Sequence, residues 1–320
     1  MDTLEKQQTL IILAAVLIGL GLGQIPLIST YSESLIIPFL LVMLYGLFLT
    51  IPLDQLKNSF THVRFLGTST IINFIWTPLL AWGLGAAFLS DHPALWIAFI
   101  MLMVTPCTDW YLVFTSIARG NVPLAASVLP INLILQVLLL PVYLLIFAGT
   151  VETIALSTIL ESVLLVFLFP FTLAQLTRVV FRKNQELLQK RVIPFFASAQ
   201  LIFLCLAIIS MFASQGSYLW SNLEIIYVLL IPILFYFIIN FGLGQLLCKW
   251  LNMSYEDSVS LHFTIIARNS PVALAIAITA FSDQPIVALA LVIGPLIELP
   301  VLAIVAQVLL LLKPKIKGQS

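Results

Sequence analysis

Residues 97–109 read IAFIMLMVTPCTD, an apolar run that ends at Pro106 and continues into Cys107, Thr108 and Asp109. Residues 259–271 read VSLHFTIIARNSP, a second apolar run that ends in the same way, at a polar segment and a proline. Proline removes a backbone hydrogen-bond donor and clashes with the preceding helical turn. Both stretches therefore predict a helix that is interrupted in its middle.

The composition places these helices in a membrane. The chain has 320 residues, of which 61% are hydrophobic and 9% are charged, whereas soluble domains carry about 25% charged residues. Fourteen Lys and Arg balance fourteen Asp and Glu without a basic block, which argues against a nucleic-acid partner. The apolar runs are continuous and do not alternate, so the expected class is an all-α polytopic membrane protein and not a β-barrel.

Ten apolar stretches are long enough to cross a bilayer, for which about 20 residues are needed. Their connections are short, so no soluble domain is expected. The ten predicted spans cover residues 9–28, 35–53, 65–88, 93–118, 122–149, 154–180, 193–213, 223–248, 258–281 and 284–312.

The basic residues give the orientation of these spans. Thirteen of the fourteen Lys and Arg fall before span 1, after the even-numbered spans or at the end of the chain. The positive-inside rule makes that side the cytoplasm. We therefore expect a multi-pass protein of the plasma or inner membrane with both termini in the cytoplasm. The exception is Arg268, in the middle of span 9.

The spans divide into two groups of five, 1–150 and 151–320. Because five is odd, the second group enters the membrane from the opposite side, as in many secondary transporters built from inverted repeats. Pro106 and Pro130 have the same spacing as Pro271 and Pro295. Interrupted spans at matching places in two halves point to a transport site. We expect helix breaks at Pro106, Pro271 and Pro295.

Charged residues at membrane depth are costly, usually face the bundle interior and find a partner. We expect Asp109 and Arg268 to face each other where the two broken helices cross. The alternative is that each reaches an interface or is satisfied by backbone carbonyls. A low-dielectric environment favours the protonated form of a carboxyl group, so Asp109 and Glu298 are the candidate proton carriers. The alternative for Glu298 is a structural hydrogen bond to the backbone.

Several other polar residues have simpler interpretations. Asn132 and Gln136, one helical turn apart, are expected to form interhelical hydrogen bonds. Cys107 is either a soft ligand for a soft metal or metalloid or a small hydrophobe, while the other two cysteines are expected only to pack. The three histidines are expected in loops or at helix ends.

Motifs typical of enzymes are missing from the sequence. It contains no Walker A motif, nucleophile elbow, paired-histidine zinc motif or Cys-x-x-Cys pair. We therefore expect a protein that is not an enzyme and that needs no cofactor or resident metal.

The interrupted spans also resemble a known family. Residues 105–108 (TPCT) and 118–121 (ARGN) are similar to the fourth span of the arsenite efflux permeases, which belong to the bile acid/arsenite transporter superfamily. Residues 292–302 (VIGPLIELPVL) resemble the tenth span of these permeases. Phe263, Thr264, Asn269 and residues 273–277 (ALAIA) resemble the ninth.

The resemblance implies a ten-helix fold with a panel domain and a core domain, in which spans 4 and 9 cross. It implies efflux of arsenite, and of antimonite, driven by the proton gradient, with Cys107 in the place of an important cysteine of the family. The expected partners are a small solute, protons and the lipid bilayer. The residues expected to contact substrate are Cys107, Thr108, Asn269, Ser270 and Arg268.

Two other functions remain open. The protein could resemble the bile acid symporters in moving a small organic anion, whose carboxylate Arg268 and the half-helix N-termini would hold. It could also be a membrane sensor or structural subunit that transports nothing, although broken helices and buried charges argue against that.

Overall fold

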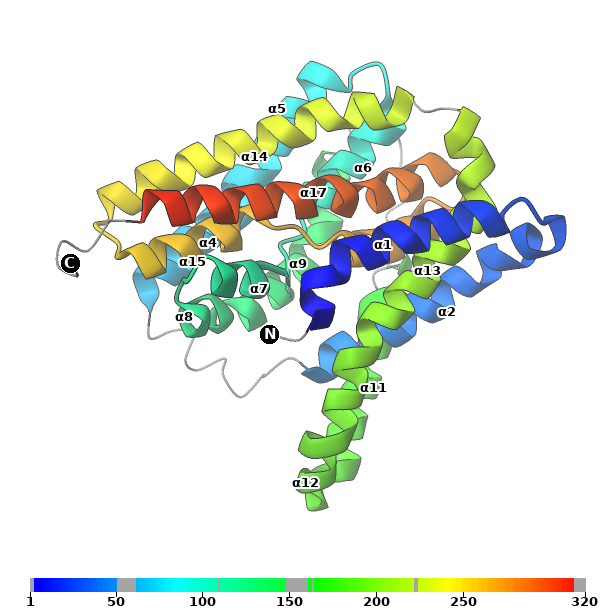
Figure 1. Ribbon diagram of the computed structural model, residues 1–320, viewed down its shortest axis with the longest axis horizontal. Helices are drawn as coiled ribbons and strands as arrows, with labels where there is room; N and C mark the ends of the chain where they lie inside the picture. Colours follow the sequence, from blue (N-terminus) through cyan, green and yellow to red (C-terminus); the bar gives the residue numbers. More distant parts are fainter. Residues whose placement is uncertain are drawn as a thin grey trace.

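The computed structural model describes residues 3–50, 62–108, 110–147, 161–162, 164–221 and 224–313. The regular structure in these segments is helical (Figure 1). In chain order the elements are α1 (Thr3–Leu22), α2 (Pro26–Thr50), α4 (Val63–Ile71), η2 (Ile72–Trp76), α5 (Thr77–Phe88), α6 (Pro93–Met103), α7 (Trp110–Ile117), α8 (Val122–Ser127), α9 (Leu129–Ile146), η4 (Leu164–Leu168), α11 (Phe169–Val180), η5 (Phe181–Lys183), α12 (Gln185–Leu187), η6 (Leu188–Val192), α13 (Ile193–Ser221), α14 (Glu224–Trp250), α15 (Tyr255–Ile266), α16 (Ser270–Ala280) and α17 (Pro285–Leu312).

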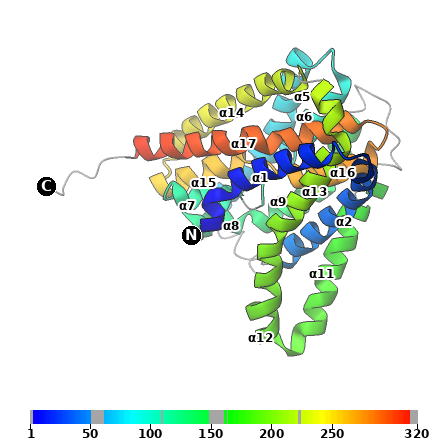
Figure 2. The ribbon, with the colours of Figure 1, turned by 45° about the vertical axis from the view of Figure 1, so that its right-hand side comes forward.

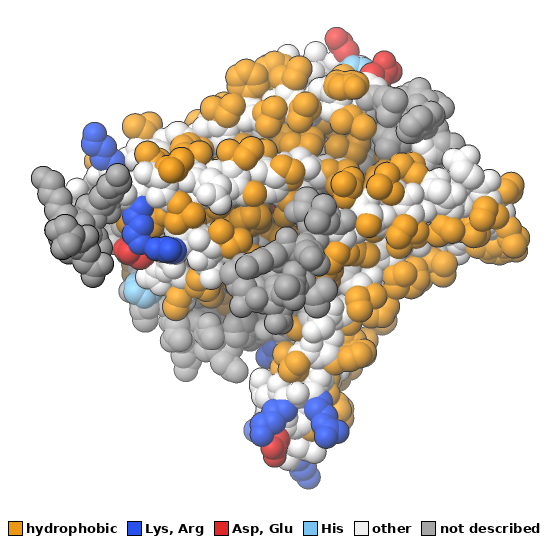
Figure 3. All heavy atoms as spheres, viewed as in Figure 1, with side chains coloured by type: hydrophobic (Ala, Val, Ile, Leu, Met, Phe, Trp, Pro, Cys, Tyr) orange, Lys and Arg blue, Asp and Glu red, His pale blue; other side chains and the backbone are white. Residues whose placement is uncertain are grey.

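Within the described residues, seven helices are long and apolar enough to cross a membrane. Three further apolar helices are shorter, namely Leu13–Leu22, Pro93–Met103 and Ser270–Ala280. Hydrophobic side chains cover most of the described surface in Figure 3, and Lys and Arg side chains gather mainly at its extremities. The protein is therefore a multi-pass helical membrane protein.

The first helices begin and end at other residues than the sequence predicted. α1 ends at Leu22 and α2 begins at Pro26, whereas the expected spans were 9–28 and 35–53. Proline fits the first turn of a helix, where no backbone N–H is needed, so Pro26 starts the second helix. α13 also runs further than expected, to Ser221 instead of residue 213.

Helices α1, α2, α11 and α13 pack on one another and are called the panel below (Figures 1 and 2). The approach of α1 to α13 depends on two glycines spaced four residues apart. A Cβ atom at Gly19 would lie 2.7 Å from the carbonyl oxygen of Ile209, and one at Gly23 would lie 2.7 Å from that of Ala213. Small residues with this spacing let membrane helices approach closely.

Helices α4 to α9 and α14 to α17 form the remaining group, called the core below. α17 packs against α6, α7, α14 and α16, and most of its first ten residues are buried. It therefore lies inside this group, in contact with both interrupted spans, α6–α7 and α15–α16.

The ends of three core elements meet around Tyr255, the first residue of α15. Its hydroxyl group lies 3.0 Å from the carbonyl oxygen of Ala118 and 3.2 Å from that of Leu309. The ammonium group of Lys313 lies 5.2 Å from the centre of its ring. The ends of α7 and α17 and the start of α15 thus share one end of the core, together with the basic residues Arg119 and Lys313.

The glycine contact gives a test of the panel. Gly19→Leu should weaken the packing of α1 on α13, because overpacking a close contact costs about 1–3 kcal/mol. We expect a lower melting temperature and less monodisperse protein in detergent, measured by fluorescence-detected size exclusion after heating. Gly21→Leu is the matched control, since a Cβ atom at Gly21 would meet nothing within 4 Å. Equal effects of the two substitutions would contradict this packing.

Candidate functional site

The two interruptions have local causes in the sequence. α6 ends at Met103, three residues before Pro106, and α15 ends at Ile266, where Ala267 turns to an extended conformation (φ −72°, ψ 140°). Asn269 then caps α16, and its side-chain oxygen accepts the N–H of Val272 at 3.3 Å.

The two interruptions pair with each other through their backbones, as an isolated antiparallel bridge between Pro106 and Arg268. The N–H of Cys107 donates to the carbonyl of Ala267 at 3.1 Å, and the N–H of Asn269 donates to the carbonyl of Thr105 at 2.7 Å. Backbone groups at membrane depth must be satisfied inside the protein, and each break here supplies partners for the other. We call this pairing the bridge.

Side chains of both breaks tighten the bridge. The amide nitrogen of Asn269 donates to the hydroxyl oxygen of Thr108 at 3.1 Å. The hydroxyl of Thr105 lies 3.3 Å from the carbonyl oxygen of Asn269. All three residues are buried, so the bridge is a network of satisfied polar groups and not an open loop.

Each of the three prolines expected at a helix break leaves the carbonyl four residues earlier without its usual helical partner. Each of these carbonyls has found another donor. The pairs are Leu102 O with the Thr105 hydroxyl at 3.1 Å, Ala267 O with Cys107 N at 3.1 Å, and Leu291 O with the Ser270 hydroxyl.

Pro295 corrects one sequence prediction, because α17 continues through Pro295 and Pro300 without a break. The carbonyl oxygen that Pro295 releases, on Leu291, accepts a hydrogen bond from the hydroxyl group of Ser270 in the neighbouring break. The helix therefore stays intact, and its missing hydrogen bond is used to hold α16.

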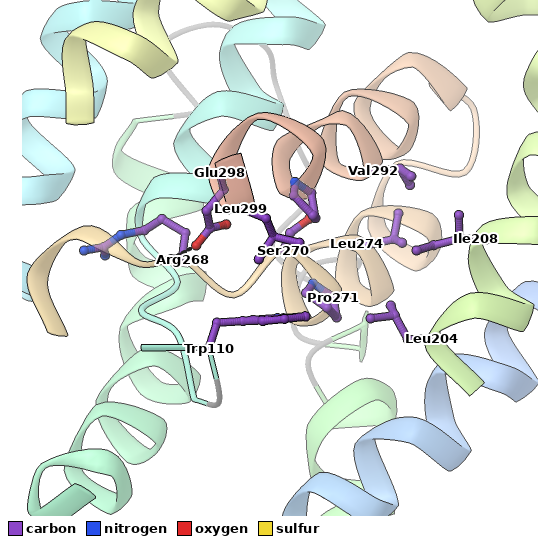
Figure 4. Close-up of a pocket in the computed structure, with 11 residues that line it drawn as sticks. Trp110, Leu204, Ile208, Arg268, Ser270, Pro271, Leu274, Val292, Glu298 and Leu299 are labelled. Atoms are coloured by element: carbon purple, nitrogen blue, oxygen red, sulfur yellow. Dashed lines mark hydrogen bonds between the residues drawn. The ribbon is translucent and has the colours of Figure 1, made fainter. Parts of the chain in front are cut away.

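Glu298 links α17 to the bridge. Its carboxylate oxygen Oε1 accepts the backbone N–H of Arg268 at 2.7 Å, and the side chain is buried. Figure 4 shows the carboxylate of Glu298 beside the backbone of Arg268, while the guanidinium group points away from Trp110 and Pro271. The geometry corresponds to the structural hydrogen bond considered as the alternative for this residue.

The guanidinium group of Arg268 contacts oxygens from three elements. Nη1 donates to Met103 O at 3.0 Å, Nε donates to Ile266 O at 3.2 Å, and Nη2 donates to Asn73 Oδ1 at 2.9 Å. Nη2 also donates to Ile265 O. The residue is 1% exposed. The expected partner, Asp109, lies outside the described residues, and the four oxygens that accept from the guanidinium group belong to neutral groups.

A cavity of about 370 Å³ lies between the panel and the bridge. None of the described residues that line it is charged. They are Met43, Leu47, Thr50, Cys107, Thr108, Trp110, Leu112, Val113, Ala197, Gln200, Leu201, Leu204, Asn269 and Pro271.

Three of the five residues expected to contact substrate line this cavity: Cys107, Thr108 and Asn269. Arg268 and Ser270 instead border a second space of about 20 Å³ beside Glu298. The bridge thus brings the predicted residues together, but they border two neighbouring spaces that share Trp110, Leu204 and Pro271.

The panel contributes two polar residues that the sequence analysis did not single out. Gln200 of α13 donates from Nε2 to the hydroxyl oxygen of Thr50 at 3.2 Å, at the end of α2, and both line the cavity. Their signal in the sequence is a polar side chain inside or at the end of an apolar span. That signal does not identify what the side chain faces.

Two other predictions were wrong. His262 is buried inside α15, with Nδ1 2.7 Å from Ser258 O, and is not at a helix end. Asn132 and Gln136 are buried in α9, but their side-chain amides have no hydrogen-bond partner in the described part of the chain. Among the described residues, the expected interhelical hydrogen bonds of this pair are therefore not formed.

Comparison with known proteins agrees with this architecture. Residues 37–222 match the Sodium Bile acid symporter family, and the chain belongs to this family. The protein is 29% identical over 290 residues to the arsenical-resistance protein Acr3 of Corynebacterium glutamicum, covering 87% of this chain and 78% of the relative. The predicted superfamily is thereby confirmed.

Other relatives are transporters by name. An uncharacterised sodium-dependent transporter of Bacillus subtilis, YocS, is 26% identical over 80% of this chain and 78% of its own length. An uncharacterised transporter of Synechocystis sp. is 24% identical over 96% of this chain and 88% of its own length. The protein is thus a membrane transporter for a small solute.

The hydrogen bond from Arg268 to Glu298 predicts different effects for two substitutions. Glu298→Leu leaves the buried N–H of Arg268 without an acceptor, which costs about 1–3 kcal/mol, and should lower the melting temperature in detergent. Glu298→Gln keeps an acceptor oxygen and should melt close to the native protein. If the melting temperatures of both variants fall equally, the negative charge of Glu298 and not its acceptor oxygen holds the bridge.

Proposed function

We propose that the protein is a secondary active transporter that carries arsenite, and the related solute antimonite, out of the cell in exchange for protons. The observation that carries the proposal is the cavity beside the bridge, which has Cys107 in its wall and no charged residue among the described residues that line it. Arsenous acid is an uncharged solute at neutral pH, and soft centres such as trivalent arsenic favour sulfur ligands. The relative named for arsenical resistance supports the same solute.

The residues around the cavity take separate roles in this proposal. Cys107 binds the arsenic atom, while Thr108 and Asn269 on the core side form hydrogen bonds with the arsenite hydroxyl groups. Gln200 and Thr50 offer polar groups from the panel side. A solute in this cavity touches both groups of helices, so its binding depends on how the panel sits against the core.

Arg268 and Ser270 hold the bridge in this proposal instead of contacting the solute. The hydroxyl of Ser270 donates to Leu291 O, and the guanidinium group of Arg268 is engaged by four oxygens. Neither residue lines the larger cavity.

Proton exchange is assigned to Asp109, which follows Thr108 directly in the chain. Glu298, the other carboxyl group expected to carry a proton, already accepts the N–H of Arg268. We therefore assign Glu298 to positioning the bridge and leave Asp109 as the residue that couples transport to the proton gradient.

The proposal includes the membrane topology expected from the sequence. Ten spans form two inverted repeats, 1–150 and 151–320, whose boundary lies outside the described residues. Both termini are cytoplasmic, the membrane is the plasma or inner membrane, and the protein works without cofactor and without enzyme activity. Arg119 and Lys313, which share one end of the core, are consistent with a cytoplasmic end there. Alternating access then moves the bridge relative to the panel.

The competing function is transport of a small organic anion. It needs a cation that can reach a carboxylate, and no charged residue is among the described residues lining the cavity. Arg268 is only 1% exposed, and Figure 4 shows its guanidinium group pointing away from Trp110 and Pro271, two of the residues that line the cavity. These observations favour a neutral solute over an anion.

Cys107→Ser tests the ligand. In everted membrane vesicles, the native protein should accumulate arsenite when a proton gradient is applied, and the serine variant should lose at least about tenfold of this activity, the change that about 1.4 kcal/mol produces. Cys205→Ser and Cys248→Ser are the matched controls, because neither cysteine lines the cavity, and both should transport like the native chain.

The same vesicles separate the alternatives. Competition among organic anions in the native chain, without arsenite accumulation, would move the protein to the organic-anion function and leave Cys107 as a packing residue. Failure of every tested solute to cross would contradict the arsenite proposal and favour the third function, a membrane sensor or structural subunit.

Asp109→Asn tests the coupling. The amide cannot exchange a proton, so accumulation of arsenite should become the same with and without the proton gradient, while arsenite still equilibrates across the membrane. Asp283→Asn, a change at an exposed carboxylate, is the control and should keep the gradient dependence. An Asp109→Asn variant that still accumulates arsenite with the gradient would assign the proton to another group.

A further inference from the structure

The oxygens around the guanidinium group of Arg268 come mainly from helix ends. Met103 O is the last carbonyl of α6, and Ile265 O and Ile266 O are the last two of α15. The fourth oxygen is Oδ1 of Asn73, from η2. Two half-helices that are far apart in the sequence therefore point their C-terminal ends at one positive group.

This arrangement creates a requirement for positive charge. The last carbonyls of a helix have no partner within it, and the C-terminal end carries a partial negative charge. Two such ends at one place repel each other, and water is not available at membrane depth to satisfy them. In secondary transporters, half-helix C-terminal ends and unwound carbonyls commonly coordinate a free sodium ion or a proton.

The charge of Arg268 is balanced in the way a bound metal ion is balanced, by dipoles. Glu298 meets the backbone N–H of Arg268 and forms no ion pair with its guanidinium group among the described residues. Tyr236 closes another side, with its ring centre 5.4 Å from the guanidinium carbon and its hydroxyl 3.2 Å from Ile265 O. Arg268 and Tyr236 are almost completely buried.

We propose that Arg268 is a tethered cation. It fills the site that a free monovalent cation would otherwise have to occupy at the ends of α6 and α15, so that the bridge forms and persists without sodium. Removal of the side chain leaves an oxygen-lined space that takes up a guanidinium ion or a sodium ion from solution. This inference concerns the ion requirement of the protein and does not depend on which solute it carries.

The test is a melting experiment in detergent with added cations, which needs no transport. The native chain and Arg268→Ala are compared in sodium chloride, guanidinium chloride and N-methylglucamine chloride at equal, millimolar concentrations, so that ionic strength is constant. We expect the native melting temperature to be the same in all three salts. Arg268→Ala should melt at least about 5 °C lower and recover saturably with guanidinium or sodium, but not with N-methylglucamine.

Arg178→Ala is the matched control. Arg178 also donates to a backbone carbonyl near the end of a helix, that of Leu49 at 2.9 Å, but it is only half-buried. Its loss should not be repaired saturably by guanidinium, because water can replace the side chain.

Arg268→Lys keeps the inference testable if the alanine variant cannot be purified. Lysine retains a tethered cation with fewer donors, so this variant should melt below the native chain and remain insensitive to sodium. Saturable stabilisation of the native chain or of Arg268→Lys by sodium would overturn the proposal. So would an Arg268→Ala variant that is as stable as the native chain, or one that neither cation restores.

Discussion

The hydrogen-bonded bridge between the two interrupted spans is the constraint on which the rest of the site depends. Neither break could exist alone at membrane depth, because its released backbone groups would lack partners. The N–H of Cys107 needs the carbonyl of Ala267, and the N–H of Asn269 needs the carbonyl of Thr105. The two breaks must therefore form together, and segments about 160 residues apart in the chain fix each other's geometry. The positions of Cys107, Thr108 and Asn269 in the wall of the neighbouring cavity follow from this pairing.

Much of this architecture could be predicted from the sequence, because it follows from strong local signals. The long apolar runs indicate membrane helices, and a proline inside an apolar run indicates a weakened helix. Pro106 and Pro271 lie at true interruptions, whereas Pro295 does not. The difference is a tertiary contact, since the carbonyl that Pro295 releases meets the hydroxyl of Ser270. Such a donor comes from another helix, so the sequence near the proline does not show it.

The partners of Arg268 were harder to predict for the same kind of reason. A charged residue inside an apolar span indicates that a partner is needed, and an acidic side chain such as Asp109 is the first candidate. Backbone carbonyls, however, occur at every residue, so the sequence does not show which of them a guanidinium group will reach. Asn73 and Gln200 are visible only as polar residues in apolar spans, and their place beside the bridge or the cavity follows from packing.

The bridge also explains how one crossing can contain both a buried positive charge and a cavity whose described lining residues are all uncharged. Successive side chains of an extended backbone point to opposite faces, and residues 267–269 are part of such a segment. Arg268 turns toward the ends of α6 and α15, whereas Asn269 turns toward the cavity with Thr108. The positive charge that the half-helix ends require therefore belongs to a residue that is not among those lining the cavity. In the function we propose, a neutral solute binds at the crossing without competing with a fixed charge, and the bridge moves against the panel as one unit because its polar groups are satisfied within the core.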